Sequence, residues 1–164
     1  FAGYRVDNKP LEHYFNLFDP GSQTALNAAI RGAHDRGRPI VAYYWEPTPL
    51  LGELDMILLK EPDYDEEIFT RTCLCQNPSF SVEKAVNAKW VQGHAEVVPL
   101  LEKFHLSLEM TNEVLAWMEA HGNDPQKAAL WFLKNNTDFW HSWVDDSEEV
   151  SEKVDKALEK EMLP

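Results

Sequence analysis

Clustered basic residues, long apolar runs and glycine-rich phosphate loops are all missing from this sequence of 164 residues. Its 15 Lys and Arg against 28 Asp and Glu give a formal net charge of -13. Proteins that bind nucleic acid neutralise phosphates with clustered Lys and Arg, so no nucleic-acid partner is expected, and anionic membrane surfaces are disfavoured as well. No apolar run is long enough to span a bilayer. The Gly-x-Ser-x-Gly motif of serine hydrolases is also absent.

Cysteine is scarce, with only Cys73 and Cys75, separated by one residue. Alternate residues of a strand lie too far apart for an unstrained disulfide, so we interpret the pair as two reduced, partly buried thiols. The alternative, a metal or redox pair, lacks a second Cys pair or a His at ligand spacing. The six histidines are scattered and form no His-x-x-x-His motif. The sequence therefore predicts no metal, no cofactor and no catalytic residue.

The overall amino-acid composition is that of an ordinary globular protein. Apolar residues make up 44% of the chain and charged residues 26%, as in an average soluble globular protein. The chain begins with Phe1 rather than Met, which favours a mature or trimmed product, or a fragment.

The first part of the chain is predicted to form a parallel βαβ unit. Residues 14–18 form a short apolar strand, and Ser22 is the expected N-cap of the helix that follows. The second strand, residues 40–45, is too continuously apolar to have a solvated face, which is typical of parallel sheets covered on both sides. Further strands are expected at residues 55–59, 68–74 and 82–86.

Beyond Asn87 nearly every segment is predicted to be helical. Ser107 is an expected N-cap, and Asp124-Pro125 combines an N-cap with proline at the first helical position. The segment from residue 145 to 161 is strongly acidic with a thin apolar stripe, which indicates a marginal amphipathic helix. The chain therefore divides near residues 75–81 into an α/β part and a helical part.

Three aromatic residues, Tyr43, Tyr44 and Trp45, stand at the end of the second predicted strand. Glu46-Pro47 follows, and a second proline two residues later cannot continue a central strand, so the chain must leave the sheet here. Ligands bind at this carboxyl edge in open α/β sheets, where a Trp face can bind a cation with about 0.5–2 kcal/mol. The alternative is that the three rings are simply core.

The ordered series of these motifs resembles the substrate-binding proteins of glycine betaine/proline/choline ABC transporters. The resemblance covers residues 12–144, most of this chain, and the chain is about half the length expected for a family member. The matching runs are residues 20–22, 25–26, 37–41, 44–47, 54–55, 86–87, 100–107, 124–129 and Trp143.

The resemblance implies an α/β fold with periplasmic-binding-protein-like (type II) lobes, in which a parallel βαβ part is followed by a helix-rich part. Residues 1–75 would then be the α/β segment of one lobe, and residues 76–144 the helix-rich segment of the other. Residues 145–164 would form an acidic C-terminal helix or tail.

The resemblance also implies that aromatic rings enclose a quaternary ammonium group. The family's Trp-x-Pro loop supplies one of these rings, and that motif is Trp45-Glu46-Pro47 here. Trp45 is thus the main candidate for ligand binding, and Tyr44, Tyr43, Glu46 and Pro47 complete the predicted set.

The resulting hypothesis is an extracytoplasmic solute-binding component of an ABC importer, in the periplasm or at the outer face of the cell membrane. It would capture glycine betaine or a related osmoprotective solute, such as choline or proline, and deliver it to a membrane permease. The alternatives are a ligand-sensing or structural domain that kept the fold without transport and, less favoured, an enzyme acting on quaternary amines. Because open sheet edges pair with other chains, we also predict a homodimer formed by exchange of elements.

Overall fold

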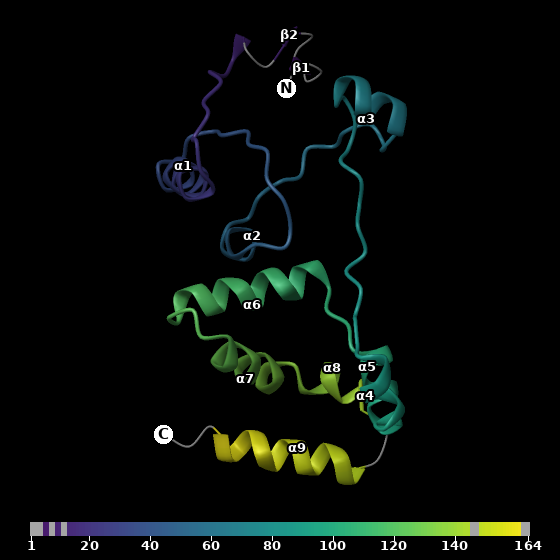
Figure 1. Cartoon of the computed structure of the whole chain (residues 1–164). Coiled ribbons are helices and arrows are strands. Elements are labelled where there is room, and N and C mark those ends of the chain that lie inside the picture. Colours follow the sequence, from purple (N-terminus) through teal and green to yellow (C-terminus); the bar gives the residue numbers. More distant parts are fainter. Residues whose placement is uncertain (1–4, 7–8, 11–12, 145–147, 162–164) are drawn as a thin grey trace. The chain divides into compact units, whose positions relative to one another are not determined.

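Figure 1 shows the chain as a computed structural model, which describes residues 5–6, 9–10, 13–144 and 148–161. The expectation for the chain start, and those for residues 145–147 and 162–164 of the acidic tail, lie outside the described residues. The chain divides into two compact units. Unit 1 comprises residues 1–44 and 57–81, and unit 2 comprises residues 45–56 and 82–164. The division into lobes at residue 75 stays a prediction.

Unit 1 is built around one regular helix, α1 (Gln23–Asp35). The Ser22 hydroxyl accepts a hydrogen bond from the Ala25 N–H at 3.2 Å, which confirms the predicted N-cap. Ile30 and Ala33 are the buried residues on its apolar face. Unit 1 also contains the short helix α3 (Glu66–Thr72), which begins where the Asp65 carboxylate accepts from the Ile68 N–H.

The regular elements in the described residues of unit 2 are all helices, joined by non-helical segments. In chain order its elements are α2 (Pro49–Glu53), α4 (Ala88–Gln92), the 3-10 helix η2 (Ala95–Val97), α5 (Val98–Lys103), α6 (Leu108–Ala120), α7 (Pro125–Asn135), α8 (Thr137–His141) and α9 (Glu148–Glu161). The predicted caps Ser107 and Asp124 are confirmed, since their side chains accept from backbone N–H groups of α6 and α7. Asn123, with a φ of 58°, lies in the turn between these two helices.

The core of unit 2 is aromatic. Phe132, Trp140 and Trp143 are its buried members, and the Trp140 indole N–H donates to the Leu133 carbonyl at 2.8 Å. This hydrogen bond avoids the desolvation cost of about 1–3 kcal/mol that an unpaired buried donor carries. The buried Trp143 indole N–H of the same cluster has no such partner among the described residues. The partly buried side chains packed against this cluster are Met110, Val114, Trp131, Leu133, Phe139, Val144, Val154 and Leu158. The described part of α9 therefore docks on the core by one edge through its apolar stripe.

The parallel α/β sheet predicted from the sequence is wrong. In the described ranges the strands are β1 (Arg5–Val6) and β2 (Lys9–Pro10), which form an antiparallel pair. Most of the predicted strand at residues 68–74 belongs instead to α3. The other four predicted strands, residues 14–18, 40–45, 55–59 and 82–86, contain no strand. The periplasmic-binding-protein-like (type II) lobe with its parallel βαβ part is therefore not what the structure contains.

The physical reason is that apolar composition does not supply a partner. A parallel strand needs hydrogen-bonded neighbours and helices over both faces of its sheet. The side chains of Ile57 and Leu58 are 87% and 91% exposed, so this continuous apolar run has neither in the structure. At residues 68–74 the Asp65 cap and the i,i+4 ion pair between Arg71 and Glu67 favour helix over strand.

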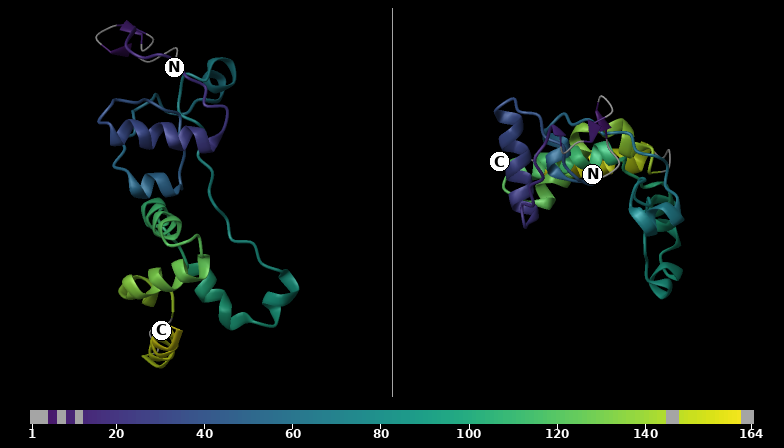
Figure 2. Two further views of the ribbon diagram at one scale, coloured as in Figure 1. Left: turned by 90° about the vertical axis from the view of Figure 1, so that its left-hand side faces the viewer. Right: turned by 90° about the horizontal axis from the view of Figure 1, so that it is seen from above.

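Helices α2 and α6 pack closely together within unit 2, as both views of the unit show (Figures 1 and 2). Gly52 permits this approach. A Cβ atom at position 52 would lie against the backbone carbonyl of Asn112 and 2.9 Å from the Ala116 Cβ. Because the nearest atoms belong to helix backbone, they cannot move aside as a flexible side chain would.

We predict that Gly52→Ala destabilises unit 2 by about 1–3 kcal/mol, the usual cost of forcing extra volume into packed structure. Urea unfolding followed by circular dichroism measures this change. Gly93→Ala is the matched control, because a Cβ there would lie 3.7 Å from the Trp90 carbonyl, an ordinary contact. Equal stability of the two variants would contradict the close α2–α6 packing.

Candidate functional site

The five predicted ligand-binding residues are divided between the two units along the chain. Tyr43 and Tyr44 end the first segment of unit 1, whereas Trp45, Glu46 and Pro47 begin the first segment of unit 2. Within each unit one of these residues is hydrogen-bonded to a helix: Tyr44 to α1 and Glu46 to α6.

Tyr44 is anchored by α1. Its hydroxyl donates a hydrogen bond to the Asn27 Oδ1 atom at 2.8 Å, and its ring is half-buried. Tyr43, one residue earlier, is exposed. The two neighbouring rings therefore lie in different environments: Tyr44 is bonded to α1, whereas Tyr43 is exposed.

The segment from Trp45 to Pro49 is held by α6. The Glu46 Oε1 atom accepts from the Asn112 side-chain Nδ2 at 2.8 Å, and the Thr48 backbone N–H donates to the Asn112 Oδ1 at 2.7 Å. The peptide bond between Glu46 and Pro47 is cis. Trp45 keeps 40% of its side chain exposed, so an anchored loop carries an accessible indole.

Helix α2 fixes the other end of this loop. The Thr48 hydroxyl accepts from the Leu51 N–H at 3.4 Å, and Pro49 occupies the first turn of the helix. This is the pairing of an N-cap with a following proline. Leu50 is 1% exposed, so α2 buries this apolar side chain within unit 2. The same signal was recognised in the sequence at Asp124-Pro125 but missed at Thr48-Pro49.

Asn112 was not among the site residues predicted from the sequence. It lies 64 positions after Thr48 in the chain and is 5% exposed. In the structure Asn112 is a polar side chain among half-buried residues of α6. A buried polar side chain needs a hydrogen-bond partner, but the sequence does not show which residue that partner is.

The sequence matches the OpuAC family, the substrate-binding domain of ABC-type glycine betaine transport systems, over residues 2–135. The chain belongs to this family. The match includes both the Trp45–Pro49 loop and Asn112, and it confirms the resemblance drawn from the sequence. Searches of curated proteins and of solved structures found no match.

Membership of OpuAC sets the broad class of function. The family consists of solute-binding domains rather than enzymes, and such a domain of an ABC importer implies a small-molecule ligand and a permease partner. Across the described ranges, no helix has both the length and the apolar character needed to cross a bilayer. The same ranges contain no group of three or more His, Cys, Asp or Glu placed to hold a metal ion.

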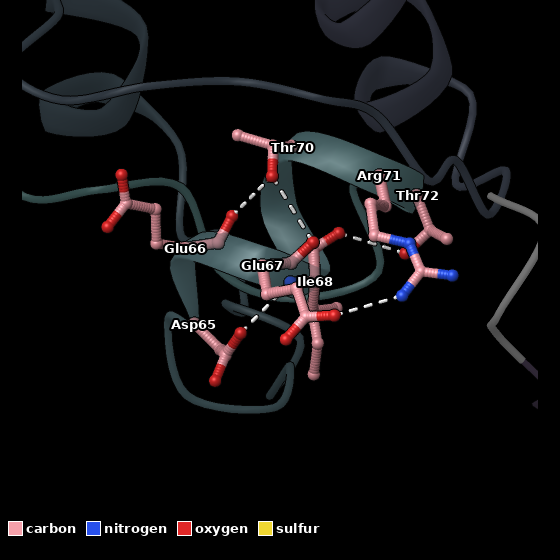
Figure 3. Close-up of polar contacts among 7 residues, drawn as sticks. All are labelled: Asp65, Glu66, Glu67, Ile68, Thr70, Arg71 and Thr72. Atoms are coloured by element: carbon pink, nitrogen blue, oxygen red, sulfur yellow. Dashed lines mark hydrogen bonds and ion pairs between the residues drawn. The ribbon is translucent and has the colours of Figure 1, made fainter.

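A second feature of this OpuAC chain is an open depression of about 220 Å³ along α3, lined by Glu67, Ile68, Arg71 and Thr72. Figure 3 shows its polar contacts, chiefly the 3.0 Å ion pair between Arg71 and Glu67 and hydroxyl-to-carbonyl bonds along the helix. Its lining comes from successive turns of one short helix, so no polar groups converge on a ligand from different elements. We assign it no binding role.

Both cysteines follow α3, with Cys73 as its C-cap, and both are free. Cys75 is buried, with its thiol 3.6 Å from the Asp65 carbonyl, whereas Cys73 is exposed. The interpretation as two unpaired thiols is confirmed, but only Cys75 is buried.

We expect Tyr44→Phe to lower the stability of unit 1 by about 0.5–1.5 kcal/mol, because Asn27 loses its hydrogen-bond donor. Thermal unfolding of the purified chain measures the loss. Tyr64→Phe, at an exposed tyrosine of the same unit, is the control and should leave stability unchanged. A Tyr44→Phe variant as stable as the control would argue against the anchor.

Proposed function

We propose that this OpuAC chain binds glycine betaine, or a related quaternary ammonium compatible solute such as choline, for an ABC importer outside the cytoplasm. The observation that carries the proposal is the family match over residues 2–135. A net charge of -13 is compatible with a cationic or zwitterionic solute.

Trp45 is the residue we propose to contact the quaternary ammonium group. The face of an indole attracts a cation electrostatically, and Trp is the aromatic side chain best suited to this contact. The support is threefold: Trp45 begins the Trp-x-Pro motif, its side chain is 40% exposed, and the loop that follows it is anchored to α6. Pro47 is proposed to shape the same loop. Tyr43 and Tyr44 precede Trp45 in the chain and stay predictions as further ring contacts.

We expect calorimetric titration of the purified chain with glycine betaine to show saturable binding, and Trp45→Ala to weaken it roughly tenfold or more. Trp90→Ala is the matched control. Trp90 belongs to the same unit and is 45% exposed, but its ring is stacked on His94 at 4.4 Å. This control should bind like the unsubstituted chain.

Two results would contradict the proposal. Equal losses in the Trp45 and Trp90 variants would show that the contact is not specific to Trp45. Absence of binding to glycine betaine, choline and carnitine in the unsubstituted chain would favour a structural or sensing domain without ligand capture.

We also propose that the chain forms a homodimer. The support is a set of apolar side chains that are almost fully exposed and would bury one another in a second copy: Leu17, Ile57, Leu58, Phe80 and Val82. Burying such surface is worth about 25 cal/mol per Å² of apolar area removed from water.

For the homodimer, light scattering coupled to size-exclusion chromatography should give twice the chain mass of 18.9 kDa. Replacing both Ile57 and Leu58 by Ser should shift the population toward the single-chain mass. A monodisperse single-chain mass for the unsubstituted protein would rule the dimer out.

A further inference from the structure

One oxygen of the Glu46 carboxylate is already engaged, because it accepts from the Asn112 side chain at 2.8 Å. We propose that Glu46 is a positioning residue rather than the predicted ligand contact, and that Asn112 and Glu46 together form a clamp that sets the Trp45 ring for the ligand. The inference rests on the proposed function, because it concerns how the same loop is prepared for binding.

The first step of the argument is the use of both ends of one amide. A side-chain amide has one acceptor oxygen and one NH₂ donor group. The Asn112 oxygen accepts from the Thr48 backbone N–H at 2.7 Å, while its nitrogen donates to the Glu46 carboxylate at 2.8 Å. One side chain of α6 therefore fixes the loop at two points, on either side of Pro47.

The second step is burial. Asn112 and Thr48 are 5% and 3% exposed, so water cannot easily replace the hydrogen bond between them, whereas the bond to Glu46 is part-buried. A buried donor or acceptor left without a partner carries its full desolvation cost, which makes the clamped arrangement strongly preferred over an open one.

The third step links the clamp to binding. Trp45 is the residue immediately before Glu46, so a fixed Glu46 limits the backbone conformations open to Trp45. A binding group held in place before the ligand arrives loses less conformational freedom on association. Glu46 thus serves binding through the position of the ring, and its carboxylate is engaged by α6 rather than offered to the ligand.

Exchanging the polarity of the clamp tests this assignment. Asn112→Asp places a second carboxylate against Glu46 and removes the donor. Glu46→Gln alone keeps an acceptor for Asn112. The double variant, Asn112→Asp with Glu46→Gln, restores one hydrogen bond with donor and acceptor reversed, and the carboxylate introduced on α6 still accepts from the Thr48 N–H.

The affinity for glycine betaine, measured by calorimetry, should follow this pattern. We expect Glu46→Gln to bind within about threefold of the unsubstituted chain, because an exposed charge contributes little. Asn112→Asp should lose roughly tenfold or more, and the double variant should recover most of that loss. A large loss in Glu46→Gln that persists in the double variant would show that Glu46 contacts the ligand directly and would overturn the proposal.

Hydrogen exchange at the Thr48 backbone amide, followed by NMR, reports on the clamp without any ligand. Protection should fall roughly tenfold or more in Asn112→Asp, because repulsion between the introduced carboxylate and that of Glu46 pushes the loop away from α6, and it should return in the double variant. Unchanged protection in Asn112→Asp, or a double variant that fails to regain it, would overturn the clamp. If the unsubstituted chain does not bind glycine betaine, the proposed function fails, while this exchange pattern still decides whether the clamp exists.

Discussion

The arrangement around the candidate site depends on two hydrogen bonds made by the buried side chain of Asn112. Its two hydrogen bonds tie the loop before α2 to the N-terminal half of α6, and Gly52 lets the two helices approach closely enough for those bonds to form. The bonds and the packing support each other, because a wider helix spacing would leave the amide and the Thr48 N–H buried without partners. The accessible indole of Trp45 therefore stands on a loop whose geometry is set by packing inside unit 2.

The aromatic core gives unit 2 the stability that such a loop requires. Phe132 lies within the span matched to the OpuAC family, but Trp140 and Trp143 lie beyond residue 135, where that match ends. Helix α9, which follows them, contributes Val154 and Leu158 to the same cluster. The segment after the matched span is thus part of the folded unit, because the core would lose two of its three buried members without it.

Local signals in the sequence were sufficient to predict local structure. Ser22, Ser107 and Asp124 cap helices as expected, because an N-cap needs only its own side chain and the next three residues. The sheet was predicted wrongly because an apolar segment such as residues 55–59 does not reveal whether a neighbouring strand exists to pair with it. The role of Asn112 could not be predicted either, since its partners lie 64 and 66 positions away and only the fold brings them together.

The family assignment was reachable from the order of motifs along the chain, and it gives the class of ligand, whereas the structure shows how one loop is held. The central claim is that Trp45 meets a quaternary ammonium solute from this anchored loop. ¹⁹F NMR of the chain labelled with 5-fluorotryptophan tests it most directly, with each resonance assigned by substitution. On titration with glycine betaine, we predict a saturable shift of the Trp45 resonance and a stationary Trp90 resonance. A Trp45 resonance that does not move at saturating solute would contradict the claim.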